Sequence, residues 1–452
     1  MNVIAAYVIF VPASALCFAL LRFRTALLLV LIGGWWLLPV GRYEPVDPGT
    51  ILPWWITGTA LPSDMLLTKA WIAPLVAFAG AAWRGPQPLR SWRPTALDGL
   101  MIGWCLWPLA DGFGRQSNPG AAIASLYVAG VWGLPWLIGR VWLSGMAGEL
   151  ALTRGLAVSA LANLPVAVIE GVRPAMLYGL LYGPHPYHLD GVARYVGYRP
   201  IGFLEHGNLY GLWTALAAFA AVWLLRERHG PRGWRWTCLA VINVLVALAS
   251  QSVGALILLA LGLSLLALWR TRLFTPLVTL SAALLLVIGV AHMTGMLPIR
   301  RLAESPAGVR ILGQMRAIGR GSFLWRVSQD LKSLDTVAAY PMTGTVTWDW
   351  WRPNGTRPWG QPLLLIGQYG LVGFLLAWGA LVGASAAAFM RLRKWGDRLG
   401  GEATLPLAII VVLALLDATQ NAFFFSPAIV AAGAIAVRPT LRSRSANGAD
   451  LP

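Results

Sequence analysis

Long apolar runs, separated by short basic clusters, recur along most of this chain. A helix needs about 20 apolar residues to cross the hydrocarbon core of a bilayer, and tilt or interfacial tryptophans help shorter ones. Such a run satisfies its own backbone polar groups in a bilayer by forming a helix. We therefore predict about thirteen transmembrane helices, within a range of 12–14. They cover residues 2–21, 25–40, 65–83, 95–111, 121–138, 150–170, 208–225, 236–249, 253–269, 273–291, 362–390, 404–416 and 423–437.

The composition agrees with an integral membrane protein. Hydrophobic residues make up 57% of the 452 residues and charged residues only 12%, whereas soluble domains carry roughly a quarter charged residues. The 24 tryptophans are typical of interfacial belts. We predict an all-α, polytopic bundle in which residues 1–452 form a single domain. The three cysteines lie inside apolar runs without metal-ligand spacing, and no nucleotide-binding motif is present, so we predict neither metal nor cofactor.

The basic clusters predict how the chain is oriented. They lie between or after apolar runs, at residues 22–24, 84–93, 140, 226–235, 270–272, 391–398 and 438–444. The positive-inside rule places all of them in the cytoplasm, including a basic tail at residues 438–452. Residues 171–206 and 294–361 then lie outside as two periplasmic segments. The net charge of +17 sits mainly at the ends of the apolar runs, so it favours lipid or phosphate binding and not a nucleic-acid partner.

The two outside segments differ in character. Residues 171–206 are rich in Pro, Tyr and Gly and hold three of the five histidines, His185, His188 and His206. Residues 294–361 form a large basic loop with nine Lys or Arg and four acidic residues. Within this loop Phe323, Val327, Leu331 and Leu334 recur at helical spacing, which predicts a short amphipathic helix lying on the bundle.

Three local patterns surround these segments. Arg199, Gly202, His206 and Asn208 precede the run at 208–225; Ser252, Gly254 and Ala255 begin the run at 253–269; and Arg326, Pro341 and Gly344 precede Gly367-Gln-Tyr-Gly-Leu-Val-Gly373. Over about residues 195–380 this order resembles the O-antigen ligase and polymerase superfamily, which includes the Wzy-type polymerases. Val253 stands where the family pattern has Arg, and Trp359-Gly360 stands where the ligases have a His–Asn pair. The resemblance therefore favours a polymerase over a ligase.

The resemblance implies an activity and a set of partners. Family members transfer a glycan from undecaprenyl pyrophosphate to an acceptor hydroxyl without nucleotide or metal. The expected function is a membrane glycan polymerase that joins lipid-linked repeat units into exopolysaccharide or O-antigen at the periplasmic face of the bacterial inner membrane. The expected partners are the undecaprenyl-pyrophosphate-linked glycan, membrane lipid and a chain-length regulator. The alternatives are a ligase that transfers finished glycan to lipid A core or protein, a transporter or flippase with inverted repeats and broken helices, and a structural partner in an envelope complex.

The chemistry of this transfer assigns candidate roles. Arginines suit a departing diphosphate because their planar donors stay protonated, so we predict catalytic roles for Arg199 and Arg326. Glu205 and His206 are the candidate bases for the acceptor hydroxyl, and Asp349 is a third option. We predict that the substrate-binding residues are Asn208, Gly344, Asp349, Arg352, Arg357, Lys69 and Arg154. Asp349 lies in the Trp348–Trp351 cluster, which suits either a sugar platform or an interfacial anchor.

Several ionisable residues fall within apolar runs, where they are costly and mark functional candidates. These are Lys69, Asp98, Asp111, Arg154, Glu170 and Asp417. Lys69 and Arg154 are expected to reach the outer headgroups and hold the lipid phosphate, while salt-bridge pairing inside the bundle is the alternative to a functional role for the acids. Gln420 and Asn421 either bind sugar or satisfy a helix end. Arg199 as a snorkelling residue and His206-Gly-Asn208 as a helix cap remain structural alternatives.

Overall fold

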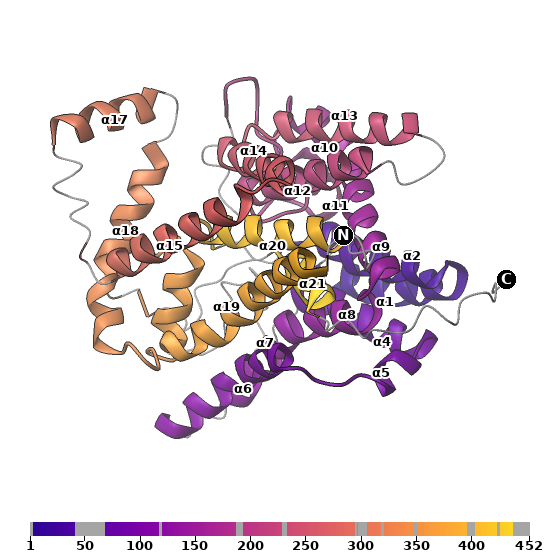
Figure 1. Cartoon of the computed structure of the whole chain (residues 1–452). Helices are drawn as coiled ribbons and strands as arrows, with labels where there is room; N and C mark the ends of the chain where they lie inside the picture. The colour runs from indigo at the N-terminus through magenta and orange to yellow at the C-terminus, as the bar shows by residue number, and fades with distance from the viewer. Residues whose placement is uncertain are drawn as a thin grey trace.

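Figure 1 shows the computed structural model of the chain. The structure describes residues 3–40, 68–116, 120–186, 193–227, 233–293, 296, 305–317, 321–347, 350–351, 353, 355, 357–395, 403–422 and 425–436. These residues form helices joined by turns, and the extended pairing among them is a single bridge between Ala193 and Tyr198. The expected all-α fold is therefore confirmed for this part of the chain. The predicted tail at residues 438–452 lies outside it.

Every apolar run identified in the sequence contains a helix in its described part. The helices are α1 (Val3–Leu20), α2 (Phe23–Leu28), α3 (Gly34–Leu37), α4 (Lys69–Arg84), α6 (Ala96–Gln116), α7 (Gly120–Val128), α8 (Leu134–Trp142), α9 (Met146–Ser159), α10 (Asn163–Glu170), α12 (Gly207–Arg226), α13 (Gly233–Ala249), α14 (Val253–Leu268), α15 (Phe274–Met293), α19 (Gln361–Trp395), α20 (Thr404–Ala418) and α21 (Ser426–Ile435). Four more helices lie between them: α5 (Gln87–Arg90), α11 (Met176–Tyr182), α17 (Pro306–Ala317) and α18 (Gly321–Ala339).

Five continuous helical segments are long and apolar enough to cross a membrane. They are Gly120–Trp142, Met146–Glu170, Gly207–Arg226, Phe274–Ala291 and Gln361–Lys394. Six further apolar helices have 10–17 residues, a length that spans a bilayer core only with thinning or flanking interfacial residues. The described residues thus support a bundle of membrane-spanning type, with fewer full-length spans than the 12–14 predicted.

Helix α12 forms the centre of the bundle. It packs against α9, α13, α14 and α20, and nearly all its side chains between Leu209 and Leu224 are buried. A helix that is apolar on all sides fits such a position. Trp213 on this helix stacks on Trp35 with ring centroids 4.7 Å apart, and Phe425 meets both rings edge-on. Aromatic contacts therefore join the N-terminal and C-terminal parts of the chain through α12.

Helix α4 is held between two π-helical segments. These are Leu29–Gly33, which joins α2 to α3, and Ala129–Gly133, which joins α7 to α8, and both pack against α4. Such segments are rare and often occur near functional sites. A Cβ on Gly130 would lie 2.1 Å from the Trp71 ring, so glycine allows this close approach. The packing fixes the start of α4, where Lys69 lies.

The described basic residues at the ends of α12 and α19 lie near the ends of α14 and α21. Arg226, at the end of α12, donates to the Leu266 carbonyl at 2.9 Å near the end of α14. Arg393, in the last turn of α19, lies over the Trp269 ring. Arg391 donates to the Ile435 carbonyl at the end of α21. The segment from residue 193 to His206 lies at the opposite end, because α12 begins at Gly207 and runs away from it. The described basic residues and the segment before His206 therefore lie at opposite ends of α12.

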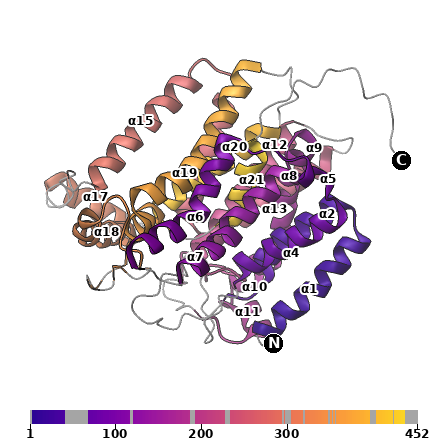
Figure 2. The same cartoon turned by 90° about the horizontal axis from the view of Figure 1, so that it is seen from below.

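The large basic loop contains two helices at one edge of the molecule. Helices α17 and α18 lie beside α15, away from α1 and α2 (Figures 1 and 2). The helix predicted from the spacing between Phe323 and Leu334 is confirmed, since α18 spans that stretch. Leu334 packs with Val337, Trp350 and Leu363, so the helix lies against the start of α19.

Helix α19 is broken at Gly370, which has φ 68° and ψ −178°. The backbone N–H groups of Leu371 and Val372 donate to the carbonyls of Pro341 and Met342, at 2.8 and 3.2 Å. On the other side of the break, the carbonyls of Gly367 and Gln368 accept from Thr345 and Val346, at 2.9 and 2.8 Å. The loop ahead of α19 therefore satisfies the polar groups that the break exposes.

Candidate functional site

The segment Ile201–Glu205 is a turn at the entrance to α12, and a buried carboxylate anchors its beginning. Glu170, the last residue of α10, accepts backbone N–H groups from Ile201 at 2.9 Å and Gly202 at 2.8 Å through Oε2. Glu170 is fully buried, and charge-assisted hydrogen bonds of this kind offset the cost of burying it. The turn is thus fixed to the bundle, so the residues on either side of it have defined positions.

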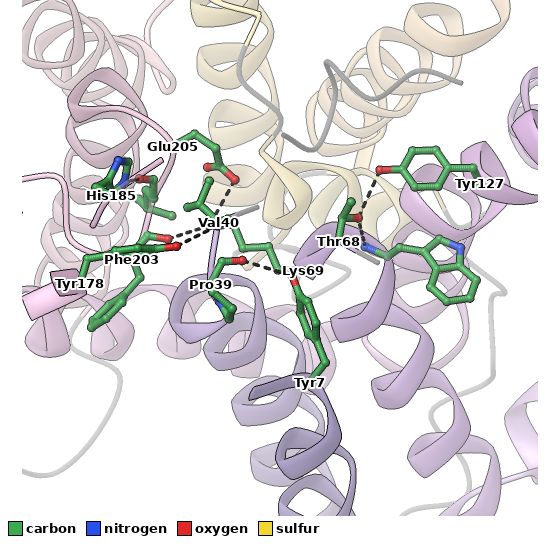
Figure 3. A network of polar contacts seen from close by, with 12 residues as sticks. Tyr7, Pro39, Val40, Thr68, Lys69, Tyr127, Tyr178, His185, Phe203 and Glu205 are labelled. Carbon is green, nitrogen blue, oxygen red and sulfur yellow. Dashed lines mark hydrogen bonds and ion pairs between the residues drawn. The ribbon is translucent and has the colours of Figure 1, made fainter. Parts of the chain in front are cut away.

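Lys69 anchors the other half of the turn (Figure 3). Its Nζ donates to the Phe203 carbonyl at 2.8 Å and lies 3.2 Å from Glu205 Oε1. Thr68 precedes it as the N-cap of α4, accepting from the Trp71 N–H, and its hydroxyl lies 3.2 Å from that of Tyr127. Lys69 is only 1% exposed. The ammonium group of Lys69 therefore lies inside the protein, where it forms a buried ion pair with Glu205.

Tyrosines and a histidine surround this ion pair. Tyr7 donates to the Pro39 carbonyl at 3.2 Å and Tyr178 donates to the Val40 carbonyl at 2.8 Å. His185 Nε2 lies 3.1 Å from the Leu204 carbonyl, and its ring lies against that of Tyr178. These contacts tie the chain after α3, α11 and the Ile201–Glu205 turn together (Figure 3). Oε2 of Glu205 is buried without a hydrogen-bond partner among the described residues.

Two arginines meet beside this turn through a pair of asparagines. Arg199 Nη1 donates to Asn208 Oδ1 at 2.9 Å, and Asn208 Nδ2 donates to Asn421 Oδ1 at 3.2 Å. Arg326 Nη1 donates to the same Asn421 oxygen at 2.6 Å and to the Gln420 carbonyl at 3.2 Å. We call Arg199, Asn208, Asn421 and Arg326 the arginine–asparagine network. It joins the entrance of α12, the end of α20 and α18.

Neighbouring residues fix both guanidinium groups. Arg199 is 6% exposed and lies across the first turn of α12, where a Cβ on Gly207 would come within 2.0 Å of its Cδ. Glycine is therefore required at position 207 for this arrangement. Arg326 lies over the Trp359 ring, 5.1 Å from its centroid, and the Trp359 N–H donates to Asp330 Oδ1 at 2.9 Å. Asp330 thus fixes Trp359, and the aromatic face of Trp359 holds Arg326 toward the network.

His206 caps α12, and the structure disfavours it as a base. Its Nδ1 accepts the Asn208 N–H at 3.0 Å, which leaves the proton of the neutral ring on Nε2. Burial, followed by the charges of Arg199 and Arg326, lowers the pKa of His206 to about 3. The imidazole therefore stays neutral at pH 7 and gains a proton only with difficulty. The geometry supports a capping residue and neutral hydrogen-bond donor, and it weighs against the expectation that His206 accepts the proton.

Asp417, which the sequence marked only as one of several ionisable residues in apolar runs, belongs to the same neighbourhood. It lies in the last turn of α20 and is 8% exposed. Asn421 Nδ2 donates to Asp417 Oδ1 at 2.9 Å, so the acid is joined to the network through Asn421. The signal in the sequence was an acidic residue in an apolar run, four positions before a polar amide in a helix end. Arg194, near the bridge between Ala193 and Tyr198, adds positive charge that acts on His206.

Other predicted site residues lie elsewhere. Arg154 lies over the Trp236 ring, 5.7 Å from its centroid. Because Trp236 lies in the first turn of α13, Arg154 is near the basic end of the bundle. The length of α12 separates it from Lys69 and the network, so the expectation that both residues reach the same headgroups is wrong. Gly344 lies at the α19 break with φ 72°, where a Cβ would approach the Gln368 carbonyl at 2.5 Å. Its geometry points to a backbone requirement.

The remaining predictions have partial answers. Arg357 is half-buried in the segment that leads into α19. Asp349 and Arg352 lie outside the described residues. Ser252, from the second sequence pattern, packs on α12, where a Cβ on Gly211 would lie 2.3 Å from its Cβ. Within the described part of the chain, no three or more His, Cys, Asp or Glu side chains gather in a way that could hold a metal ion.

The chain matches no protein-family model and no curated protein.

Proposed function

We propose that this chain is a membrane glycan polymerase of the O-antigen ligase and polymerase type. It joins undecaprenyl-pyrophosphate-linked oligosaccharide repeat units into exopolysaccharide or O-antigen on the periplasmic side of the bacterial inner membrane. It acts as a glycosyltransferase that uses a lipid pyrophosphate as leaving group. Membrane lipid and a chain-length regulator are its further partners. Five long apolar helices and the motifs around Arg199 and Arg326 support this assignment.

The observation that carries the proposal is the meeting of Arg199 and Arg326 at Asn208 and Asn421. A diphosphate gains negative charge on its oxygens as the sugar leaves. Two guanidinium groups on a rigid network can bind such oxygens through paired donors, and they keep their charge at any physiological pH. Fixed cations aimed at developing charge are usually the largest catalytic contribution. The N-terminus of α12 lies at the same place and favours an anion further.

Trp359 supports a polymerase over a ligase. It stands where the ligases carry a loop histidine, and its ring faces Arg326 at 5.1 Å. An indole offers no basic nitrogen, so a reaction at this position must take its base from another residue. The aromatic face instead fixes an arginine and offers a surface on which a sugar ring can stack.

The break in α19 is the feature that favours a transporter, because unwound membrane helices often bind ions or solutes. In such sites, free backbone carbonyls and N–H groups face the solute. Here the groups on both sides of Gly370 are bonded to the segment Pro341–Val346. They are occupied by the protein itself, which weighs against ion coordination at the break.

A reconstitution experiment tests the function. The full chain is purified into liposomes and supplied with lipid-linked repeat units extracted from cells that lack the gene. The expected result is a ladder of longer lipid-linked glycans together with released undecaprenyl diphosphate. Movement of the repeat unit across the bilayer without bond formation would instead establish a flippase. Transfer of preformed polymer to lipid A core, without chain growth, would establish a ligase.

A further inference from the structure

Asp417 has a position that a structural role alone does not explain. It lies in an apolar helix, where a carboxylate is costly and is usually retained for function. Its Oδ1 accepts from Asn421 Nδ2 at 2.9 Å, and its Oδ2 accepts no hydrogen bond from the described residues. A neutral amide or hydroxyl could accept the same bond from Asn421 without the cost of a charge. Because Oδ2 accepts no hydrogen bond from the described residues, this oxygen of Asp417 is available for another donor.

The carboxylate is placed at a defined spacing from the cations. Asn421 Oδ1 accepts from Arg326 at 2.6 Å and from Asn208 at 3.2 Å, while its Nδ2 faces Asp417. Asp417 and Arg326 are thus separated by one carboxamide and two hydrogen bonds. Arg326 is the cation whose charge acts on Asp417, and Arg199 lies beyond Asn208. The site therefore presents an acceptor for a proton on one side and donors for an anion on the other.

The other candidate bases nearby are engaged. Glu205 is paired with Lys69 through Oε1, and its Oε2 is buried. His206 Nδ1 is bonded to the Asn208 N–H. Glu170 holds the Ile201 and Gly202 N–H groups, and Asp330 accepts from the Trp359 N–H. Among the described acids and histidines around the network, Asp417 is the residue that meets two conditions. It is hydrogen-bonded to the network through Asn421, and its second carboxylate oxygen can accept a bond from a ligand.

We propose that Asp417 is the catalytic base that takes the proton from the acceptor hydroxyl. This inference rests on the proposed polymerase function and names the residue for its proton transfer. The hydroxyl oxygen of the incoming unit forms a bond to the anomeric carbon of the donor sugar. The bond between that carbon and the diphosphate oxygen breaks, and its electron pair leaves with undecaprenyl diphosphate. The hydroxyl proton moves to Asp417 and then to water, while Arg199 and Arg326 bind the departing diphosphate.

The test compares Asp417→Asn with wild type in the same liposomes, supplied with repeat units extracted from cells that lack the gene. Asparagine keeps the size of the side chain and an oxygen for Asn421, but it cannot take a proton. The expected result is a loss of polymerisation rate of about 100-fold or more. Binding of undecaprenyl diphosphate and the thermal midpoint should stay at wild-type values. Asp335→Asn is the matched control, because Asp335 is an exposed acid on α18, and it should polymerise like wild type.

The Asp417→Glu variant gives a second readout. Its carboxylate can still accept a proton, but from a shifted position, so we expect partial activity and a displaced pH–rate profile. If Asp417→Asn lowers the thermal midpoint, this variant decides: a displaced profile supports the base, and a wild-type profile overturns it. Polymerisation by Asp417→Asn within about threefold of wild type across the pH range would also overturn it while the polymerase function stands. Absence of polymer with wild-type protein would reject the function itself.

Discussion

Arg199 and Arg326 are joined through two asparagine side chains, although the arginines come from distant parts of the sequence. Arg199 donates to Asn208, and both Asn208 and Arg326 donate to one oxygen of Asn421, at 2.9, 3.2 and 2.6 Å. The network holds the two like charges at a fixed distance without direct contact. An anion that binds to both can neutralise them together, which gives the arrangement its expected affinity for a diphosphate.

Replacing either arginine by lysine should weaken diphosphate binding despite conserving the charge. Lysine provides a point charge and lacks the planar pair of donors that contacts both Asn421 and a phosphate oxygen. We expect Arg326→Lys and Arg199→Lys to lose about 10-fold or more in polymerisation, and the alanine variants about 100- to 1000-fold. Undecaprenyl diphosphate binding to the purified protein measures the first step. Arg310→Ala, at an exposed position of α17, should behave as wild type.

Gly207→Ala should displace Arg199 without unfolding α12. The new Cβ would lie 2.0 Å from Arg199 Cδ, so the arginine has to leave its position, while alanine is otherwise favourable in a helix. We expect polymerisation to fall toward the level of Arg199→Ala, with a nearly unchanged thermal midpoint. Gly254→Ala in α14 is the control, since a Cβ there meets nothing within 4 Å. Equal activity of the two alanine variants would contradict this role of Gly207.

His206 should make the folded protein sensitive to acid. Burial and the two arginines lower its pKa to about 3, against an ordinary value of 6.5. The unfolded chain then binds a proton more readily than the folded chain, so this contribution to stability is complete above pH 6.5 and is lost as the pH falls toward 3. His206→Asn keeps an N-cap acceptor and should flatten the decline of the thermal midpoint between pH 7 and pH 4. Its activity at pH 7 should stay within about threefold of wild type; a 100-fold loss would restore His206 as a base.

The helices could be predicted because their signal is local. The run at residues 253–269 became α14, Val253–Leu268, and the run at 404–416 became α20, Thr404–Ala418. Length and apolarity decide such segments before any packing is known. The interruption of α19 was not predicted, since Gly370 lies in an apolar run and the break depends on a loop that bonds to both of its sides.

The candidate site could be predicted only in part, because it depends on how helices face one another. Arg199 and Arg326 were identified from their motifs, and the structure brings them together. No sequence motif marks Asp417 or the hydrogen bonds that Ile201 and Gly202 donate to Glu170, and both features depend on the rotation of a helix about its axis. Arg154 has the same composition-level signal as Lys69 but lies at the other end of the bundle. The presence of a charged residue in an apolar run therefore did not predict the end of the bundle at which its side chain lies.

Lys69 and Glu205 should show strong energetic coupling. Both are largely buried, at 1% and 13% exposure, with Nζ and Oε1 3.2 Å apart. Removing one partner leaves the other charge without compensation, so Lys69→Met and Glu205→Gln should each lower the free energy of unfolding by about 3–5 kcal/mol. The double variant removes both charges and should lose less than the sum of the single losses. Unfolding of the detergent-solubilised protein measures the cycle, with Arg310→Ala paired to Asp335→Asn as an exposed control. If the losses in the free energy of unfolding of the two single variants simply add in the double variant, the ion pair does not stabilise the entrance of α12. The fixed position of Arg199 would then require another cause.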